Sequence, residues 1–424
     1  MGKELNNNNR ASVLGKFDAS IPGFLENPYY FYQQLREAQP IYWEQHPTER
    51  WILTRYEDVA SALHNPALIK PGPDGLLNRL PADIRKKVIP LELNLSLDML
   101  NQNPPDHTRL RSLVSQAFTP KRIEELRPYI ETVAGELINN FIHAEEFDVI
   151  HDFSSQLPAF VILKMLGVPK EDRAQIGQWS HDISDLFGAA RFGTDPITTS
   201  LQATQSSVEF QKYMRALIHH HVRHDQDEDS LLTSLLYAKT EGNMLTEAEI
   251  ISNCMLLIGA GQETTTHAIG NGLLALLKHP DQLQLLRGNP NLIKNAVEEL
   301  LRYDTPAQML VRIASDDTFI NSQKITAGQF VFMSVGAANR DPEQFTRPDE
   351  LDITRAKNQH SSFGFGIHFC LGAPLARTEM EVGLQSLIHG RLTDLQQVHE
   401  KPDWSSDVDL RGLKSFSVRF KAKI

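Results

Sequence analysis

Apolar residues recur with helical spacing through most of the chain and alternate as in strands only near its two ends. The pattern predicts amphipathic helices at about 123–144, 156–166, 174–187, 201–224 and 230–239, and a further helix beginning at Arg55. Segments 41–43 and 51–54, separated by a polar turn, predict a hairpin, and strand character returns at 324–325, 330–333 and 416–420. The pattern therefore predicts a mainly α fold with small peripheral β-sheets.

One apolar segment, 250–279, predicts a helix of about 30 residues, or about 45 Å, with a polar stretch at its middle. Polar side chains inside a buried helix need a reason. Here Gly261 removes a side chain, and the hydroxyl of Thr264 can bond back to the carbonyl of Ala260, which would leave a groove for a diatomic ligand and water. Alternatively, the small residues allow close helix packing while Glu263 faces solvent.

A glycine-rich loop, 361–372, precedes a helix-forming run at 373–389 and contains one of the two cysteines, Cys370. Gly364, Gly366 and Gly372 can adopt left-handed or tightly turned conformations and approach a flat macrocycle closely. Amides of such a turn and of a helix N-terminus favour a thiolate. The arrangement suits an axial thiolate ligand to haem iron, and an ordinary buried thiol is the alternative.

Composition excludes several classes of protein. The formal charge of −11, from 42 basic and 53 acidic residues, gives no sign of a nucleic-acid partner, and two cysteines exclude a disulfide framework. The N-terminus has no secretory h-region, and the apolar stretch 254–260 is far shorter than the roughly 18–20 residues of a membrane helix. We expect a cytoplasmic monomer without a membrane anchor, with a disordered extension at 1–20 and one catalytic domain at 21–424.

The loop reads Phe363-x-x-Gly-x-His-x-Cys370-x-Gly and resembles the haem-binding signature of the cytochrome P-450 superfamily at each fixed position. The resemblance runs from about Phe24 to the C-terminus and is to the soluble, bacterial type. It implies the P-450 fold and haem b held by Cys370, with Phe363 and Gly364 in the cofactor loop. It also implies that Glu263 and Thr264 are the acid–threonine pair that delivers protons to bound dioxygen.

Further positions match the family. Glu299 and Arg302 correspond to a buried Glu-x-x-Arg pair that supports the cysteine loop, although such a pair is usually a solvated surface contact worth little. Many members have arginine where Glu350 stands, and either Arg355 or Arg340 could replace it. The anionic haem propionates need cationic or hydrogen-bonding partners. The resemblance assigns this role to four residues: His107, Arg111, Arg312 and His368. Taken alone, His107 would be an ordinary surface or core histidine, and Arg109 falls on another helical face and reads as a surface residue.

Substrate contacts are implied in the loop 68–97, the region 186–199, one face of the long helix, the strand start 307–310 and the turn 413–416. The individual residues are Leu256, Leu257, Ala260, Ala307, Leu310 and Leu413. Their aliphatic character predicts a sizeable hydrophobic substrate such as a polyketide, macrolide, terpene or fatty-acyl compound, whereas the alternative is that they belong to the core. Segments 71–80 and 188–196 suggest lids.

The resemblance implies a monooxygenase that hydroxylates or epoxidises its substrate. The chain has no flavin, dinucleotide or iron–sulfur motif, so electrons must come from ferredoxin and ferredoxin reductase, or from flavodoxin. A basic patch for this partner is expected from Arg109, Lys121, Arg122 and Arg377. A peroxide-dependent peroxygenase and a non-catalytic haem sensor are the alternatives. The histidines at 219–221 and His224 have metal-like spacing but read as the C-terminal end of a helix.

Overall fold

The computed structural model describes residues 22–45, 49–73, 80–192, 195–224, 230–240 and 242–423, without the side chains of 187–192, 223 and 224. The predicted N-terminal extension, 1–20, lies outside these residues. So do 74–79 and 193–194, which belong to the two segments predicted as lids.

Helices dominate the fold, as the apolar pattern predicts. The α-helices are α2 (Pro28–Ala38), α3 (Tyr56–His64), α5 (Ala82–Leu95), α6 (Asp106–Ser115), α7 (Pro120–Phe141), α8 (Gln156–Met165), α9 (Arg173–Phe192), α10 (Pro196–His224), α11 (Leu231–Tyr237), α12 (Glu247–Lys278), α13 (Pro280–Gly288), α14 (Ile293–Tyr303), α15 (Val335–Ala338) and α16 (Ala373–His389). Short 3-10 or π turns are η1 (Val149–Ser154), η2 (Lys170–Asp172), η3 (Pro290–Leu292) and η4 (Gly366–His368).

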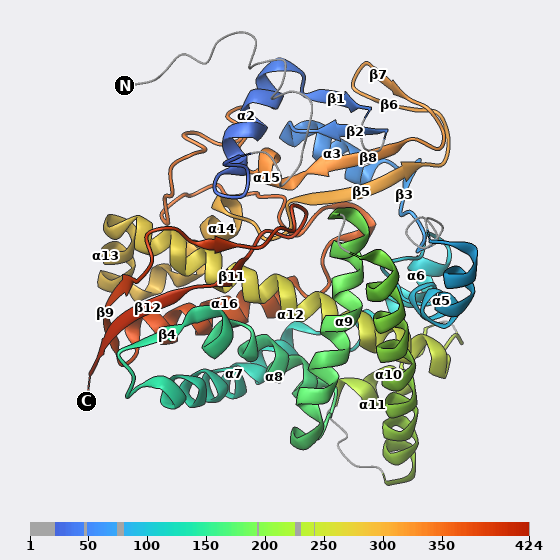
Figure 1. The fold of residues 1–424 in the computed structure, drawn as a ribbon, viewed down its shortest axis with the longest axis horizontal. Coiled ribbons are helices and arrows are strands. Elements are labelled where there is room, and N and C mark those ends of the chain that lie inside the picture. Colours follow the sequence, from blue (N-terminus) through green and yellow to red (C-terminus); the bar gives the residue numbers. More distant parts are fainter. Residues whose placement is uncertain are drawn as a thin grey trace.

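The strands form small sheets at the periphery. They are β1 (Ile41–Glu44), β2 (Arg50–Leu53), β3 (Leu68–Ile69), β4 (Glu146–Asp148), β5 (Met309–Ala314), β6 (Thr318–Ile320), β7 (Gln323–Ile325), β8 (Phe330–Ser334), β9 (Leu392–Gln397), β10 (Asp403–Trp404), β11 (Leu413–Ser415) and β12 (Ser417–Ala422). The largest sheet has the order β1-β2-β8-β5-β3, and a second has the order β4-β12-β9. In Figure 1 the largest sheet lies with α2 and α3 above the helical part of the molecule.

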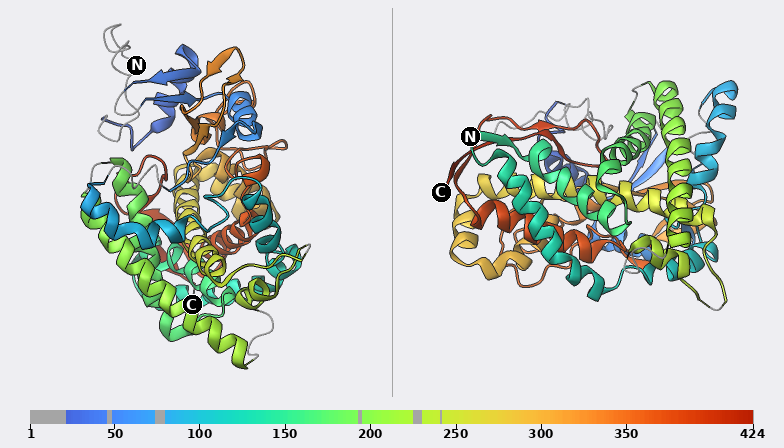
Figure 2. Two further views of the ribbon diagram at one scale, coloured as in Figure 1. Left: turned by 90° about the vertical axis from the view of Figure 1, so that its right-hand side faces the viewer. Right: turned by 90° about the horizontal axis from the view of Figure 1, so that it is seen from below.

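The long helix α12 runs through the middle of the helical part and packs against α8, α9, α14 and α16 (Figures 1 and 2). It begins three residues before the predicted start because Thr246 and Glu249 form a capping box that satisfies its first amides. Its backbone stays helical through the polar stretch at 260–265. A single element therefore connects the two ends of the helical core.

Of two local predictions near the N-terminus, the hairpin is present and the long loop is not. The hairpin is confirmed, with β1 and β2 antiparallel and Trp43 opposite Trp51. The prediction of a loop over 68–97 is wrong, because this segment contains α5. The buried residues of α5 include Ile84, Val88 and Leu91, whose spacing of three to four residues is that of a helix packed on one face.

Candidate active site

The backbone of the cysteine loop requires glycine at two positions. Gly364 and Gly366 have φ of +68° and +71°, in the left-handed region that side chains disfavour. A Cβ added to Gly366 would lie 2.6 Å from the carbonyl oxygen of Leu63, so this part of the loop passes directly against α3. Gly372 instead has φ of −78° and is the N-cap of α16.

Cys370 lies directly before α16, as the sequence predicts, and its amide donates to the carbonyl of Phe363 at 2.9 Å. The residue is accessible, but surrounding protein desolvates the thiol and raises its pKa. The amides of Gly372 and Ala373 and the positive charge of Arg111 act in the opposite direction. The amides and the cation favour a thiolate, and metal coordination would ionise the sulfur outright.

The residues predicted to bind propionates converge beside this loop. The rings of His107 and His368 lie 4.1 Å apart between centroids. Burial lowers the pKa of His107, and it lowers the pKa of His368 to about 3, with nearby positive charges adding to the effect. Arg312 is 5% exposed, and burial lowers its pKa to about 10.

This cluster lacks acidic partners. Within the described residues, neither ring nitrogen of buried His107 has a hydrogen-bond partner. Arg312 donates to the carbonyl of Val311 at 2.8 Å, and Arg111 donates to the carbonyl of Phe369. No ion pair joins either arginine to an acid in the described part of the chain. An anionic, partly buried ligand would satisfy these donors, so the site fits the propionates of haem b.

The middle of α12 is open on one side. Thr264 Oγ1 donates to the carbonyl of Ala260 at 2.8 Å, as predicted. Ala260 is exposed and residues 261–264 are partly exposed, whereas 250–255 and 268–276 are buried. A Cβ added to Gly261 would meet no atom within 4 Å. Gly261 therefore borders open space, and the alternative of close helix packing at this residue is wrong.

Glu263 does not face open solvent. It is half-buried and accepts a hydrogen bond from the hydroxyl of Ser184 on α9. Desolvation raises the pKa of its carboxyl to about 7, against a smaller lowering by His181 and Ser184. A carboxyl that titrates near neutral pH is suited to proton transfer.

Glu299 and Arg302 form a fully buried pair, not a surface contact. Both side chains are 0% exposed and are joined by two hydrogen bonds of 2.8 Å. Arg302 also donates to the carbonyls of Asn339, Pro348 and Glu350 at 2.7–3.1 Å. These bonds hold the segment after α15 against α14.

The third member of this network is Arg355, whose Nε donates to Glu299 at 3.0 Å. The network reaches the cysteine loop through Asn339, whose side-chain oxygen accepts from the amide and hydroxyl of Ser361 at 2.8 Å each. The other candidate, Arg340, pairs with Asp349 at 3.0 Å. These contacts identify Arg355, and not Arg340, as the arginine that completes the network with Glu299 and Arg302.

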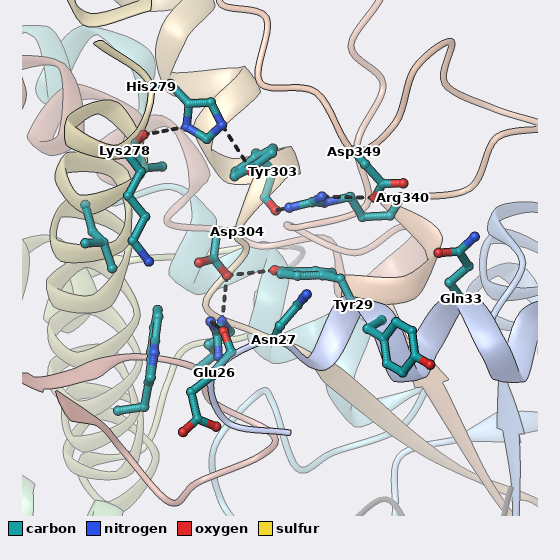
Figure 3. Close-up of a pocket in the computed structure, with 15 residues that line it drawn as sticks. Glu26, Asn27, Tyr29, Gln33, Lys278, His279, Tyr303, Asp304, Arg340 and Asp349 are labelled. Atoms are coloured by element: carbon teal, nitrogen blue, oxygen red, sulfur yellow. Dashed lines mark hydrogen bonds and ion pairs between the residues drawn. The ribbon is translucent and has the colours of Figure 1, made fainter. Parts of the chain in front are cut away.

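Arg340 lines a separate cleft of about 490 Å³ between α2, the end of α12 and the C-terminal strands (Figure 3). Asp304 accepts from the hydroxyl of Tyr29 at 2.7 Å and from Arg411 at 2.8 Å. The guanidinium of Arg340 lies 3.9 Å from the ring centroid of Tyr303. These charged groups pair among themselves, and none of the predicted site residues lines the cleft.

The predicted substrate residues differ in accessibility. Ala260 is exposed, and Leu256, Ala307 and Leu310 are partly exposed. Leu310 also approaches the cysteine loop, since its Cδ1 lies 3.6 Å from a Cβ built on Gly364. Leu257 and Leu413 are 8% and 1% exposed, which fits the alternative that they belong to the core.

Two arginines of the expected basic patch have partners that the sequence did not indicate. Arg377 forms two hydrogen bonds with Glu298, at 2.6 and 2.9 Å, and its guanidinium lies 4.5 Å from the ring centroid of Phe363. Arg109, interpreted as a surface residue, pairs with Glu249 of the capping box of α12. The histidines at 219–221 lie near the C-terminal end of α10 (Pro196–His224). Within the described residues, no group of three or more His, Cys, Asp or Glu side chains is arranged to hold a metal ion.

These features together match a haem-thiolate enzyme. They are a helical fold, a cysteine just before a helix, a long helix whose middle is exposed on one side, and a cluster of arginines and histidines without acidic partners. The family model described as Cytochrome P450 matches residues 76–406. The chain is 38% identical over 416 residues to the polyketide biosynthesis cytochrome P450 PksS of Bacillus subtilis, covering 93% of this chain and 96% of the relative. It is 40% identical over 401 residues to the biotin biosynthesis cytochrome P450 of the same species, covering 94% and 97%.

Solved structures agree with these sequence comparisons. P450BioI in complex with hexadec-9Z-enoic acid ligated acyl carrier protein matches with a TM-score of 0.86 and 38% identity, covering 94% of this chain and 99% of that chain. The chain belongs to the cytochrome P450 family and is a haem-dependent monooxygenase. Among the described helices, none is both long and apolar enough to cross a membrane.

Proposed function

We propose that Cys370 ligates the iron of haem b and that His107, Arg111, Arg312 and His368 hold its propionates. The observation that carries this proposal is the cluster of buried donors beside the cysteine loop without an acidic partner. Bound haem supplies the activation of dioxygen with two electrons. The remaining residues place the substrate and move protons.

Thr264 and Glu263 are the proton-transferring residues of this proposal. The Thr264 hydroxyl sits at the open part of α12, bonded to the carbonyl of Ala260. Glu263 has a carboxyl pKa of about 7 because of desolvation, so it can hold a proton and release it at neutral pH.

Electrons would come from ferredoxin and its reductase, or from flavodoxin, because this family normally uses redox partners. The basic patch expected for docking is weaker than its residue types suggest. Arg109 and Arg377 pair with Glu249 and Glu298, and Lys121 lies 3.7 Å from Glu125. Steering of an acidic partner would therefore depend on the field of several paired cations and decline with salt.

The proposed substrate is a largely hydrophobic natural product that is hydroxylated or epoxidised. Leu256, Ala307 and Leu310 present accessible aliphatic surface. Two relatives are named for polyketide and biotin biosynthesis, and the structural neighbour holds a fatty acid attached to acyl carrier protein. A fatty-acyl or polyketide chain, free or attached to a carrier protein, fits these observations best.

The ligation is tested by substituting each cysteine separately. The reduced protein with carbon monoxide should show the red-shifted absorption of thiolate-ligated haem, and Cys370→Ser should abolish it. Cys254, which is 0% exposed on α12, provides the control, since Cys254→Ser should keep the band. Retention of the band in Cys370→Ser would contradict the proposal.

The substrate class is tested by titration. Long-chain acids, their carrier-protein thioesters and macrolide-sized compounds should shift the haem from low to high spin. A response only to small polar amines or sugars would contradict a hydrophobic substrate.

A further inference from the structure

Helix α9 packs against α12 at the position of Gly259. A Cβ added there would lie 3.5 Å from Ser184 Oγ and 3.7 Å from Ser180 Oγ, so both serine hydroxyls stand over this glycine. Glu263 follows one helical turn later on the same face of α12. Its carboxylate accepts from the Ser184 hydroxyl, which places the acid at the boundary between the two helices.

Charged groups from two other parts of the chain act on Glu263. His181 of α9 lowers the pKa of the carboxyl, whereas Asp185 of α9 and Asp407 of the loop after β10 raise it, all with less effect than burial. On α12 itself, His267 lies one turn further along. Burial lowers the pKa of His267 to about 4, so this histidine is neutral near pH 7.

His181 and Asp185 are the accessible members of this group. Their side chains are 61% and 57% exposed, and His181 Nε2 lies 3.7 Å from Asp185 Oδ2. Ser184 belongs to the same turn of α9 and follows His181 by three residues, a spacing that places two side chains on one helical face. This turn of α9 therefore carries both an accessible His181–Asp185 pair and the hydroxyl that is bonded to Glu263.

We propose that His181 and Asp185 take up protons from solvent and pass them through the Ser184 hydroxyl to Glu263. The Ser184 oxygen accepts one proton from the surface pair and gives its own to the Glu263 carboxylate, so the serine is unchanged and Glu263 becomes the acid. This inference rests on the proposed proton-transferring role of Glu263. The α9 residues act through Glu263 as positioning and relay residues. They are His181, Ser184 and Asp185.

Charge substitutions should move the titration of Glu263 in opposite directions. Because His181 lowers the pKa of Glu263 and Asp185 raises it, His181→Gln should raise this pKa and Asp185→Asn should lower it. The infrared carboxyl band of the holoenzyme that disappears in Glu263→Gln reports this pKa directly, without turnover. Its midpoint near pH 7 in the parent protein should shift upward in the first variant and downward in the second. Unchanged midpoints, or shifts of the same sign, would overturn the inference.

The relay itself is tested with the two serines over Gly259. Ser184→Ala should slow the proton-dependent step about tenfold and divert reductant to peroxide, a moderate loss for a proton relay. Ser180→Ala should do neither, and Ser184→Thr should restore coupling because it keeps the hydroxyl. Equal coupling in Ser184→Ala and Ser180→Ala would overturn the relay.

Glu263→Gln distinguishes a failure of the proposed role of Glu263 from a failure of the route through α9. If Glu263→Gln leaves coupling unchanged, the proposed role of Glu263 fails and the relay fails with it. If Glu263→Gln uncouples the enzyme while the α9 variants behave as the parent protein, the proposed function stands and only the route through α9 is wrong. An unaltered carbon monoxide band in each variant establishes that the haem site is intact.

Discussion

Alanine at Gly366 should destabilise the protein about twice as much as alanine at Gly364, two residues earlier. Both glycines have φ near +70°, so each substitution forces a Cβ into the left-handed region, which costs roughly 1–2 kcal/mol. At Gly364 the new Cβ would lie 3.6 Å from Leu310 Cδ1, an ordinary contact. At Gly366 it would lie 2.6 Å from the Leu63 carbonyl oxygen, and a backbone group must move.

Displacing packed backbone adds about 1–3 kcal/mol, so Gly366→Ala should lose about twice as much stability as Gly364→Ala. Urea midpoints of the purified proteins measure the difference. They should be taken with and without haem, because a ligand that binds only the folded protein adds its binding energy to stability. Because Gly364→Ala shares the φ strain, it isolates the effect of the contact with α3. Equal midpoints for the two variants would refute the reasoning.

Three further predictions concern two buried ionisable groups and the Thr264 hydroxyl. Arg302→Lys should lose about 3–5 kcal/mol of stability because it breaks a fully buried ion pair. Arg347→Lys, in an exposed pair, should change stability by less than about 1 kcal/mol. Urea midpoints of the two variants measure both effects. Burial raises the pKa of Glu379 to about 8, so between about pH 5 and pH 8 the folded protein holds a proton that the unfolded chain has lost. Its stability should therefore fall as pH rises through this range, and Glu379→Gln should flatten the slope. An unchanged slope in the variant would contradict the raised pKa of Glu379. Thr264→Ala should divert reductant to peroxide, whereas Thr266→Ala, which loses a matching 2.8 Å bond to a helix carbonyl on a buried face, should stay coupled.

Features encoded by neighbouring residues could be predicted from the sequence. The helix at 373–389 and the bond from Thr264 to the carbonyl of Ala260 depend on spacing within one element, and both are present. Choosing between Arg355 and Arg340 required three-dimensional contacts, because both lie in irregular segments between α15 and α16. The pair between Arg109 and Glu249 joins residues 140 positions apart, which no local pattern reports.

α12 explains why the separate parts of the candidate site are held in one arrangement. At its N-terminus, Glu249 completes the capping box and pairs with Arg109 of α6, the helix that carries His107. At its middle, Thr265 bonds to buried Glu379 of α16, the helix that follows Cys370. Glu263 and Thr264, the proposed proton-transferring residues, lie between these two anchors. One anchor joins α12 to α6 and the other joins it to α16. A displacement of α12 along its axis would therefore have to break a polar contact at both points. The polar middle of this helix therefore keeps a fixed position relative to the cysteine loop, which is the condition for directed proton transfer.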